Sequence, residues 1–192
     1  NNMNNLFIAE NLKVMTKVLP ILKIQVHQKE VSLIIKRDHL IPVLTFLKNH
    51  IKYQFKILTC ISGVDYPSQK YRFKVVYELL SVKYNTRIRV KVLTDELTPV
   101  ESCCKIFPAA GWYESETWDM YGIFFANHIN LTRLLTDYGF EGYPLRKDFP
   151  LSGFVESSYD YTRKRVTNER VELSQEYRAF KFTSPWETLE LN

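Results

Sequence analysis

Apolar residues at steps of three and four predict two helices near the beginning of the chain. The first spans residues 4–19 and ends at Pro20, because a proline cannot continue a helix. The second spans residues 39–50, and Asp38 is placed to cap it. The apolar face of this second helix consists of Leu40, Ile41, Leu44 and Leu47.

Segments rich in β-branched and aromatic residues predict five strands. Residues 21–28 and 31–36 are short and close together, so they predict a hairpin. Residues 55–66, 71–84 and 86–94 are longer and are separated by turn residues, which predicts antiparallel strands. In the last segment apolar and basic side chains alternate, so one face is expected to be buried and the other solvated. The alternating sets are Ile88, Val90 and Val92 against Arg87, Arg89 and Lys91.

The periodic pattern weakens beyond residue 98. Residues 99–108 suit a short helix, and residues 112–125 suit another that ends at Gly122. A helix, a hairpin, a second helix and then antiparallel strands predict an α+β fold, in which a mixed or antiparallel sheet packs against helices.

The last part of the chain has little periodicity. It has too many aromatic residues for a disordered linker and too little pattern for a core of its own. We therefore divide the chain into an α+β core domain over residues 1–135 and a long irregular docking arm over residues 136–192. The arm is expected to lie along another surface, either of its own domain or of another chain.

Composition excludes several classes of protein. Of 192 residues, 45% are hydrophobic and 24% are charged, as in an ordinary globular domain. No apolar run approaches the roughly 20 residues that span a bilayer, and neither a secretory signal nor an import peptide is evident. The cysteines are odd in number and lack metal-ligand spacing, so we expect neither a disulfide framework nor a metal site. They are Cys60, Cys103 and Cys104.

The net charge of +5 leaves two interpretations open. Basic side chains near aromatic ones, in residues 86–92 and 159–165, are typical of nucleic-acid-binding surfaces. The positive charge is nevertheless spread along the chain, and solvated faces or protein-docking surfaces explain it as well. A nucleic-acid- or ribosome-binding module is therefore the alternative to a protein-binding subunit.

Three carboxylates of the helix predicted over residues 112–125 are candidates for acid–base chemistry. The three-residue spacing places Glu116 and Asp119 on one helix face, with Glu114 turned away. A structural role is the simpler interpretation, in which the carboxylates cap the helix or pair with nearby cations, namely Arg133, Arg146 and Lys147. Neither a G-x-S-x-G nucleophile motif nor a glycine-rich phosphate loop is present.

The densest polar stretch is TDYGFEGYPLRKDFPLSG, residues 136–153. It combines charges of both signs with aromatic side chains, and its glycines and prolines predict an irregular, fixed backbone. Gly139 and Gly142 follow no strand, so we interpret them as turn residues with positive φ.

This stretch and the residues before it resemble the thirty-kilodalton subunit family of respiratory complex I, the proton-pumping NADH:ubiquinone oxidoreductase. Residues 62–67 and 72–92 are similar to the family's sheet, and residues 171–187 are similar to its C-terminal arm. The chain departs from the family pattern at Ser115 and Thr132, where basic residues are usual. Residues carrying the signature are expected to form an interface, not an active site: Glu114, Glu116, Asp119, Gly122, His128, Arg133, Asp137, Tyr138, Gly139, Gly142, Pro144, Arg146, Lys147, Asp148, Pro150 and Trp186.

The resemblance implies a core subunit of the peripheral arm that scaffolds the quinone-reducing module and has no active site of its own. It implies no cofactor in this chain, whereas FMN, iron–sulfur clusters and ubiquinone belong to the assembly. The implied partners are the large quinone-site subunit and other peripheral-arm subunits, with no nucleic acid and with membrane contact only through the complex. The implied location is the matrix side of the mitochondrial inner membrane.

Overall fold

The computed structural model describes residues 12–28, 30–180 and 182. Their contacts divide the chain into two compact units, Asn1–Phe149 and Pro150–Asn192, which are described separately below. The predicted domain boundary at residue 135 thus falls within the first unit, and residues 136–149 belong to the same unit as the sheet. Whether the arm docks on another chain stays a prediction.

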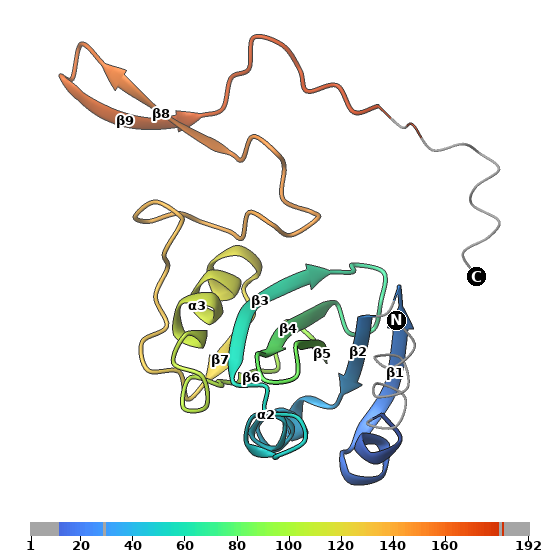
Figure 1. Ribbon diagram of the computed structural model, residues 1–192. Helices are drawn as coiled ribbons and strands as arrows, with labels where there is room; N and C mark the ends of the chain where they lie inside the picture. The colour runs from blue at the N-terminus through green and yellow to red at the C-terminus, as the bar shows by residue number, and fades with distance from the viewer. Residues whose placement is uncertain (1–11, 29, 181, 183–192) are drawn as a thin grey trace. The chain divides into compact units, whose positions relative to one another are not determined.

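The first unit is built on a five-stranded mixed sheet (Figure 1). In chain order its strands are β1 (Ile21–His27), β2 (Glu30–Ile35), β3 (Ile57–Asp65), β4 (Phe73–Ser81) and β5 (Thr86–Thr94). Their spatial order is β1-β2-β5-β4-β3, and every neighbouring pair is antiparallel except β2 and β5. The predicted hairpin, the three longer strands and the α+β class are all confirmed.

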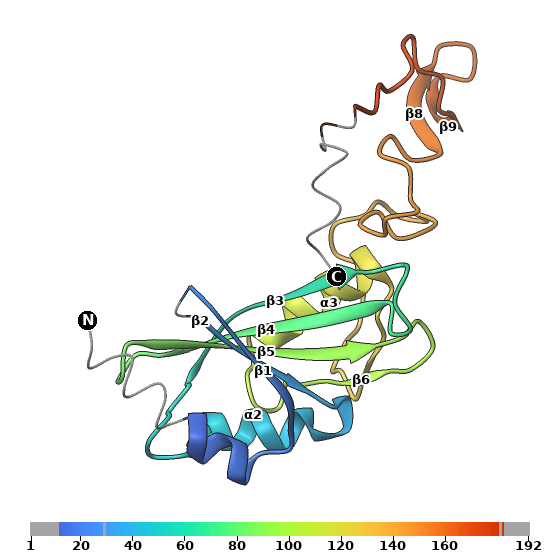
Figure 2. The same ribbon diagram turned by 90° about the vertical axis from the view of Figure 1, so that its right-hand side faces the viewer.

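Helix α2 (Leu40–Asn49) lies against one face of this sheet, after the short 3-10 helix η1 (Arg37–His39) (Figure 2). Its apolar side chains Leu40, Leu44 and Leu47 are buried, as the three- and four-residue spacing predicts. They belong to one buried core with alternate residues of the strands, including Tyr77 and Val90. Each such side chain contributes roughly 1.5–3 kcal/mol through the burial of apolar area.

A further helix and two short strands also belong to the first unit. Helix α3 (Ala110–Tyr121) packs on β3. The short strand β6 (Val100–Glu101) precedes this helix in the chain, β7 (Phe125–Ala126) follows it, and the two strands pair in parallel. A Cβ at Gly63 of β3 would lie 2.6 Å from the Tyr121 ring, so glycine is required for this close approach. Gly122 ends α3 with φ +78°, which confirms the predicted terminus.

Two local predictions are wrong. Residues 99–108 form β6 and a turn instead of a helix, because long-range bonds to β7 and to Glu114 outweigh a weak local pattern. Asp38 does not cap α2: it lies in η1 and pairs with Arg37 at 3.3 Å, while His39 holds the cap position without a side-chain bond. The predicted helix over residues 4–19 is confirmed for residues 12–18, and its earlier part lies outside the described residues.

The second unit contains a hairpin that the weak periodicity did not predict. Strands β8 (Val155–Asp160) and β9 (Arg165–Arg170) pair in antiparallel register. Asp160 shapes the turn by accepting the N–H groups of Thr162 and Arg163, and Lys164 takes the positive φ that the turn needs. An isolated two-stranded hairpin is marginally stable in water, so its exposed apolar side chains favour burial against further protein. In the part of the chain that is described, no helix is long and apolar enough to cross a membrane.

Candidate functional site

A buried carboxylate on α3 fixes the beginning of a segment that we call the polar segment, residues 133–149. Asp119 accepts the backbone N–H groups of Leu134, Leu135 and Thr136 at 2.9–3.2 Å and the Thr136 hydroxyl at 2.7 Å. Arg133 adds a longer contact at 3.4 Å. Burial alone would raise the pKa of Asp119, but these hydrogen bonds outweigh it and hold the pKa below its usual range.

A second buried carboxylate fixes the other end of the segment. Asp65, the last residue of β3, accepts a bidentate pair from Arg72 at 2.8 and 3.0 Å and the N–H of Lys147 at 2.9 Å. Arg72 also donates to Asp148 at 3.0 Å, so one guanidinium joins the sheet to the segment. The bonded Arg72 holds the pKa of Asp65 below its usual range, against the effect of burial.

Arg146 locks the middle of the segment onto the end of α3. Its Nε donates to the Tyr121 carbonyl at 2.7 Å, and its guanidinium lies over the rings of Phe73 and Tyr143. A Cβ at Gly122 would lie 2.6 Å from Arg146 Nη2 and 2.7 Å from the Tyr143 ring. Gly122 therefore serves both the helix end and the close approach of Arg146.

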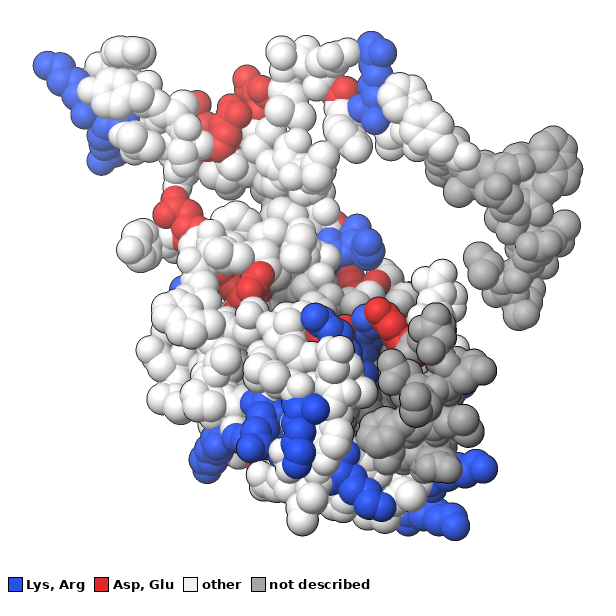
Figure 3. All heavy atoms as spheres, viewed as in Figure 1, with Lys and Arg blue, Asp and Glu red and all other residues white. Residues whose placement is uncertain are grey.

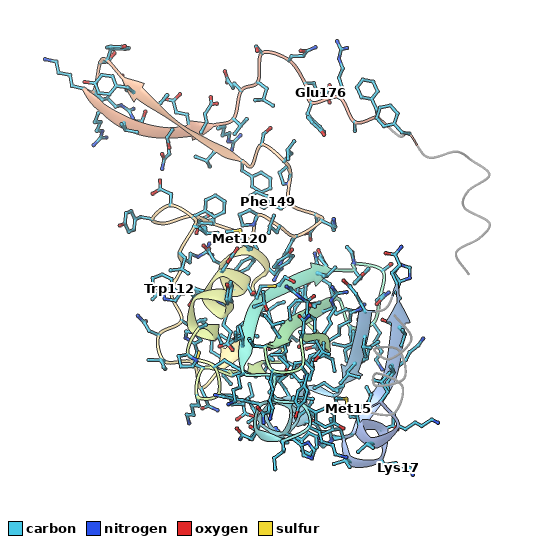
Figure 4. The ribbon with its side chains drawn as sticks, in the orientation of Figure 1. Met15, Lys17, Trp112, Met120, Phe149 and Glu176 are labelled. Carbon is cyan, nitrogen blue, oxygen red and sulfur yellow. The ribbon has the colours of Figure 1, made fainter. Side chains whose placement is uncertain are left out.

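The two turn glycines have the positive φ that was predicted, +71° at Gly139 and +97° at Gly142. At Gly142 the Phe149 ring lies against the backbone, 2.9 Å from where a Cβ would stand. The Phe149 and Phe140 rings are 6.0 Å apart, so they pack on one another. Figure 4 shows Met120 and Phe149 at the same end of α3.

Although this backbone is fixed, several apolar side chains of the segment point into solvent. Tyr138 is fully exposed, Leu135 is 65% exposed and Leu145 is 51% exposed. Trp112, at 72%, lies on the side of α3 away from the sheet (Figure 4). A rigid backbone that presents aromatic and aliphatic side chains is typical of a protein-binding surface.

A third buried carboxylate, that of Glu114, bonds the beginning of α3 to the residues that follow β6. Glu114 accepts the Ser102 hydroxyl at 2.6 Å and the Cys103 N–H at 2.8 Å, and the Cys104 thiol lies 3.3 Å away. His128 Nε2 is 3.7 Å from the same carboxylate. Sequence spacing placed Glu116 with Asp119 and turned Glu114 away, which is wrong: Glu114 and Asp119 are buried, whereas Glu116 is exposed.

These contacts favour the structural interpretation of the carboxylates. A general acid needs a raised pKa, but Asp65 and Asp119 are surrounded by donors that lower it. The predicted pairing with cations is confirmed for Asp119 and Arg133. Arg146 and Lys147 instead join the segment to Tyr121 and Asp65. Asp65 was not among the predicted site residues.

Other predicted positions lie around this framework. Asp137 accepts the N–H of Tyr138 at 2.8 Å, Pro144 is half-buried, and Pro150 begins the second unit. Trp186 lies outside the described residues. Of the two departures from the family pattern, Ser115 is buried and Thr132 is exposed.

The basic stripe on β5 gives no support to nucleic-acid binding. Ile88, Val90 and Val92 are buried as predicted, but Arg89 on the opposite face is bonded to Glu78 and to Glu30. On the visible face of the molecule, acidic and basic side chains are intermixed around the polar segment (Figure 3).

Comparison with known proteins agrees with this geometry. The family described as "Respiratory-chain NADH dehydrogenase, 30 Kd subunit" matches residues 33–155. NADH-ubiquinone oxidoreductase subunit 9 of Reclinomonas americana is 55% identical over 163 residues, 85% of this chain and 80% of that protein. NADH dehydrogenase [ubiquinone] iron-sulfur protein 3 of Oryza sativa subsp. japonica is 58% identical over 150 residues, 78% and 79% of the two chains. NADH-ubiquinone oxidoreductase subunit 9 of Prototheca wickerhamii is 52% identical over 166 residues, 86% of each chain.

The family match covers the sheet from β2 onward, α3 and the whole polar segment, which are the parts of the chain that the three buried carboxylates hold together. The chain therefore belongs to the family of 30-kilodalton subunits of respiratory-chain NADH dehydrogenase.

Proposed function

We propose that this chain is a scaffold of the NADH:ubiquinone oxidoreductase complex, of which it is a core subunit, and that it has no reaction centre of its own. The observation that carries the proposal is the polar segment, whose backbone is fixed by Asp65, Asp119 and Arg146 while Leu135 and Tyr138 face outward. Such pre-organised side chains lose little entropy on binding, so they suit a permanent contact between subunits.

The partner that fits this role is the large quinone-site subunit, together with other subunits of the peripheral arm. The second unit supports the proposal, because its hairpin exposes Tyr159, Tyr161 and Val166. We place the subunit on the matrix side of the mitochondrial inner membrane, in contact with the membrane only through the complex. In this position it would fix the shape of the quinone-reducing module without contributing a reacting group.

The word iron-sulfur in the name of one relative raises the question of a cluster in this chain. Iron–sulfur clusters are held by four cysteine thiolates, or by two cysteines and two histidines. This chain has three cysteines. Cys60 lies on β3 opposite Glu78 of β4, whereas the Cys103 N–H and the Cys104 thiol both contact the Glu114 carboxylate. These residues do not fit a cluster, so we assign FMN, iron–sulfur centres and ubiquinone to the rest of the assembly.

Assembly measurements test the proposed surface. Tyr138→Ala combined with Leu135→Ala should lower the amount of complete oxidoreductase on native gels several-fold, because a hydrophobic anchor pair is lost. Ile51→Ala removes another exposed apolar side chain, 75% exposed just after α2, and should leave assembly unchanged. Full assembly of the double variant would show that the segment does not dock.

A further inference from the structure

Among the residues that the structure describes, one group outside the polar segment has the spacing of metal ligands. It brings together Cys104 from the turn after β6, Glu114 from α3 and His128 from the loop after β7. The Cys104 Sγ and Glu114 Oε2 are 3.3 Å apart, and the His128 Nε2 is 3.7 Å from the same oxygen. All three ligand atoms lie within 4.8 Å of one another.

The Cys104–Glu114 and His128–Glu114 separations, 3.3 and 3.7 Å, match those of a tetrahedral metal site. Bonds of about 2.0–2.3 Å from zinc to sulfur, nitrogen and oxygen place neighbouring ligand atoms of a tetrahedron about 3.3–3.8 Å apart. A thiolate, an imidazole and a carboxylate also suit Zn²⁺, whereas Mg²⁺ and Ca²⁺ prefer oxygen ligands alone. We propose that Cys104, Glu114 and His128 form a binding site for a zinc-class divalent cation, with a fourth position open to solvent or to a nearby oxygen.

The surroundings provide outer partners for such a site. Glu114 is already oriented by the Ser102 hydroxyl and by the Cys103 N–H, so its carboxylate needs no rearrangement to meet a cation.

The site is nearly buried, and two of its three ligands keep a small exposed area. Glu114 has no exposed area, but Cys104 and the His128 side chain are each 5% exposed. The cluster would thus hold a cation at the rim of the core, between β6 and the start of α3. A cation bound here would add a link between three segments that hydrogen bonds and apolar packing already hold together.

Binding requires two proton movements that the geometry allows. In the metal-free chain His128 Nδ1 accepts the Asn130 N–H at 3.1 Å, so Nε2 carries the ring proton and faces the Gly111 carbonyl at 3.1 Å. Coordination through Nε2 moves this proton to Nδ1 and releases the Asn130 N–H to water, which is inexpensive because Asn130 is exposed. The Cys104 thiol releases its proton to solvent, and Glu114 binds as a carboxylate.

Cobalt provides a direct probe of the site. The full chain, purified with chelator and reductant and then freed of both, is titrated with Co²⁺ and observed by absorption spectroscopy. We expect one equivalent of Co²⁺ to give a thiolate-to-cobalt charge-transfer band and the visible bands of a tetrahedral site, and one equivalent of Zn²⁺ to displace it. Thermal unfolding of the same samples should shift upward with Zn²⁺ and not with Mg²⁺.

Matched variants decide which residues bind. Cys104→Ala should abolish the charge-transfer band, and His128→Gln should weaken Zn²⁺ binding by more than the roughly 10- to 100-fold that loss of an outer partner costs. Cys60→Ala, which removes the half-buried thiol on β3, should leave both unchanged. The proposal is overturned if the folded native chain shows no such band, or if the band survives in Cys104→Ala and is lost in Cys60→Ala.

Discussion

The carboxylate of Asp119 accepts both the N–H of Thr136, at 3.0 Å, and its hydroxyl, at 2.7 Å. One residue of α3 thereby fixes the point at which the polar segment begins, and Asp65 does the same for Lys147 near its end. The segment is consequently part of the sheet-bearing unit, although its own sequence contains no regular element.

Removal of the Asp119 charge should loosen this attachment. Asp119→Asn keeps the size of the side chain but weakens hydrogen bonds from several N–H groups, so we expect a loss of about 1.5–3 kcal/mol in the free energy of unfolding. Glu116→Gln on the exposed face of the same helix should change it by less than about 0.5 kcal/mol. Chemical denaturation of the two variants measures the difference, and equal losses would contradict the role given to Asp119.

Alanine substitutions at two glycines with similar φ angles distinguish backbone strain from steric crowding. Gly122→Ala and Gly139→Ala both place an alanine at positive φ, which costs about 1–2 kcal/mol. At Gly139 a Cβ meets nothing within 4 Å, whereas at Gly122 it lies 2.6 Å from Arg146. We therefore expect Gly122→Ala to be clearly the more destabilising change in thermal unfolding, and an equal effect would show that Arg146 is not held there.

The buried carboxylates should make the chain sensitive to acid. Hydrogen bonds from Arg72 lower the pKa of Asp65 in the folded state, and those from Thr136 and its neighbours lower that of Asp119. Their contribution is therefore complete above the unfolded pKa of about 3.9 and is lost as the pH falls through the lower folded values. Urea unfolding from pH 7 to pH 2 should show this loss below about pH 4, and it should be smaller in Asp65→Asn. An unchanged profile in that variant would contradict the assignment.

Alternation and helical spacing were sufficient to predict most of the sheet and the two principal helices. Ile88, Val90 and Val92 face the core because a strand alternates its sides, and Gly122 ends α3 because it allows positive φ. Such signals are local, and they come from residues that are close in the sequence.

The contacts that fix the polar segment could not be predicted in this way. Asp65 and Lys147 are 82 positions apart and Arg72 and Asp148 are 76 apart, so no periodic pattern links them. The same limit explains why Glu116 was grouped with Asp119 in place of Glu114: the burial of Glu114 depends on its bond with the N–H of Cys103, 11 positions earlier in the chain. The hairpin of β8 and β9 was missed because its strands, VESSYD and RVTNER, are mostly polar and carry no clear apolar stripe.

The central claim is that the polar segment holds the complex together and takes no part in its chemistry. Arg146→Ala tests it most directly, because Arg146 bonds the segment to Tyr121. Its guanidinium is also the group of the segment that would best suit a catalytic role. Arg87→Ala, at an exposed position of β5 outside the proposed docking surfaces, is the matched control.

The measurement is ubiquinone reduction per assembled complex, with the amount of complex determined on native gels. We predict that Arg146→Ala lowers the amount of assembled complex several-fold and leaves turnover per complex within about twofold of the native value. A normal amount of complex with strongly reduced turnover would contradict the scaffold account and would place chemistry in the segment.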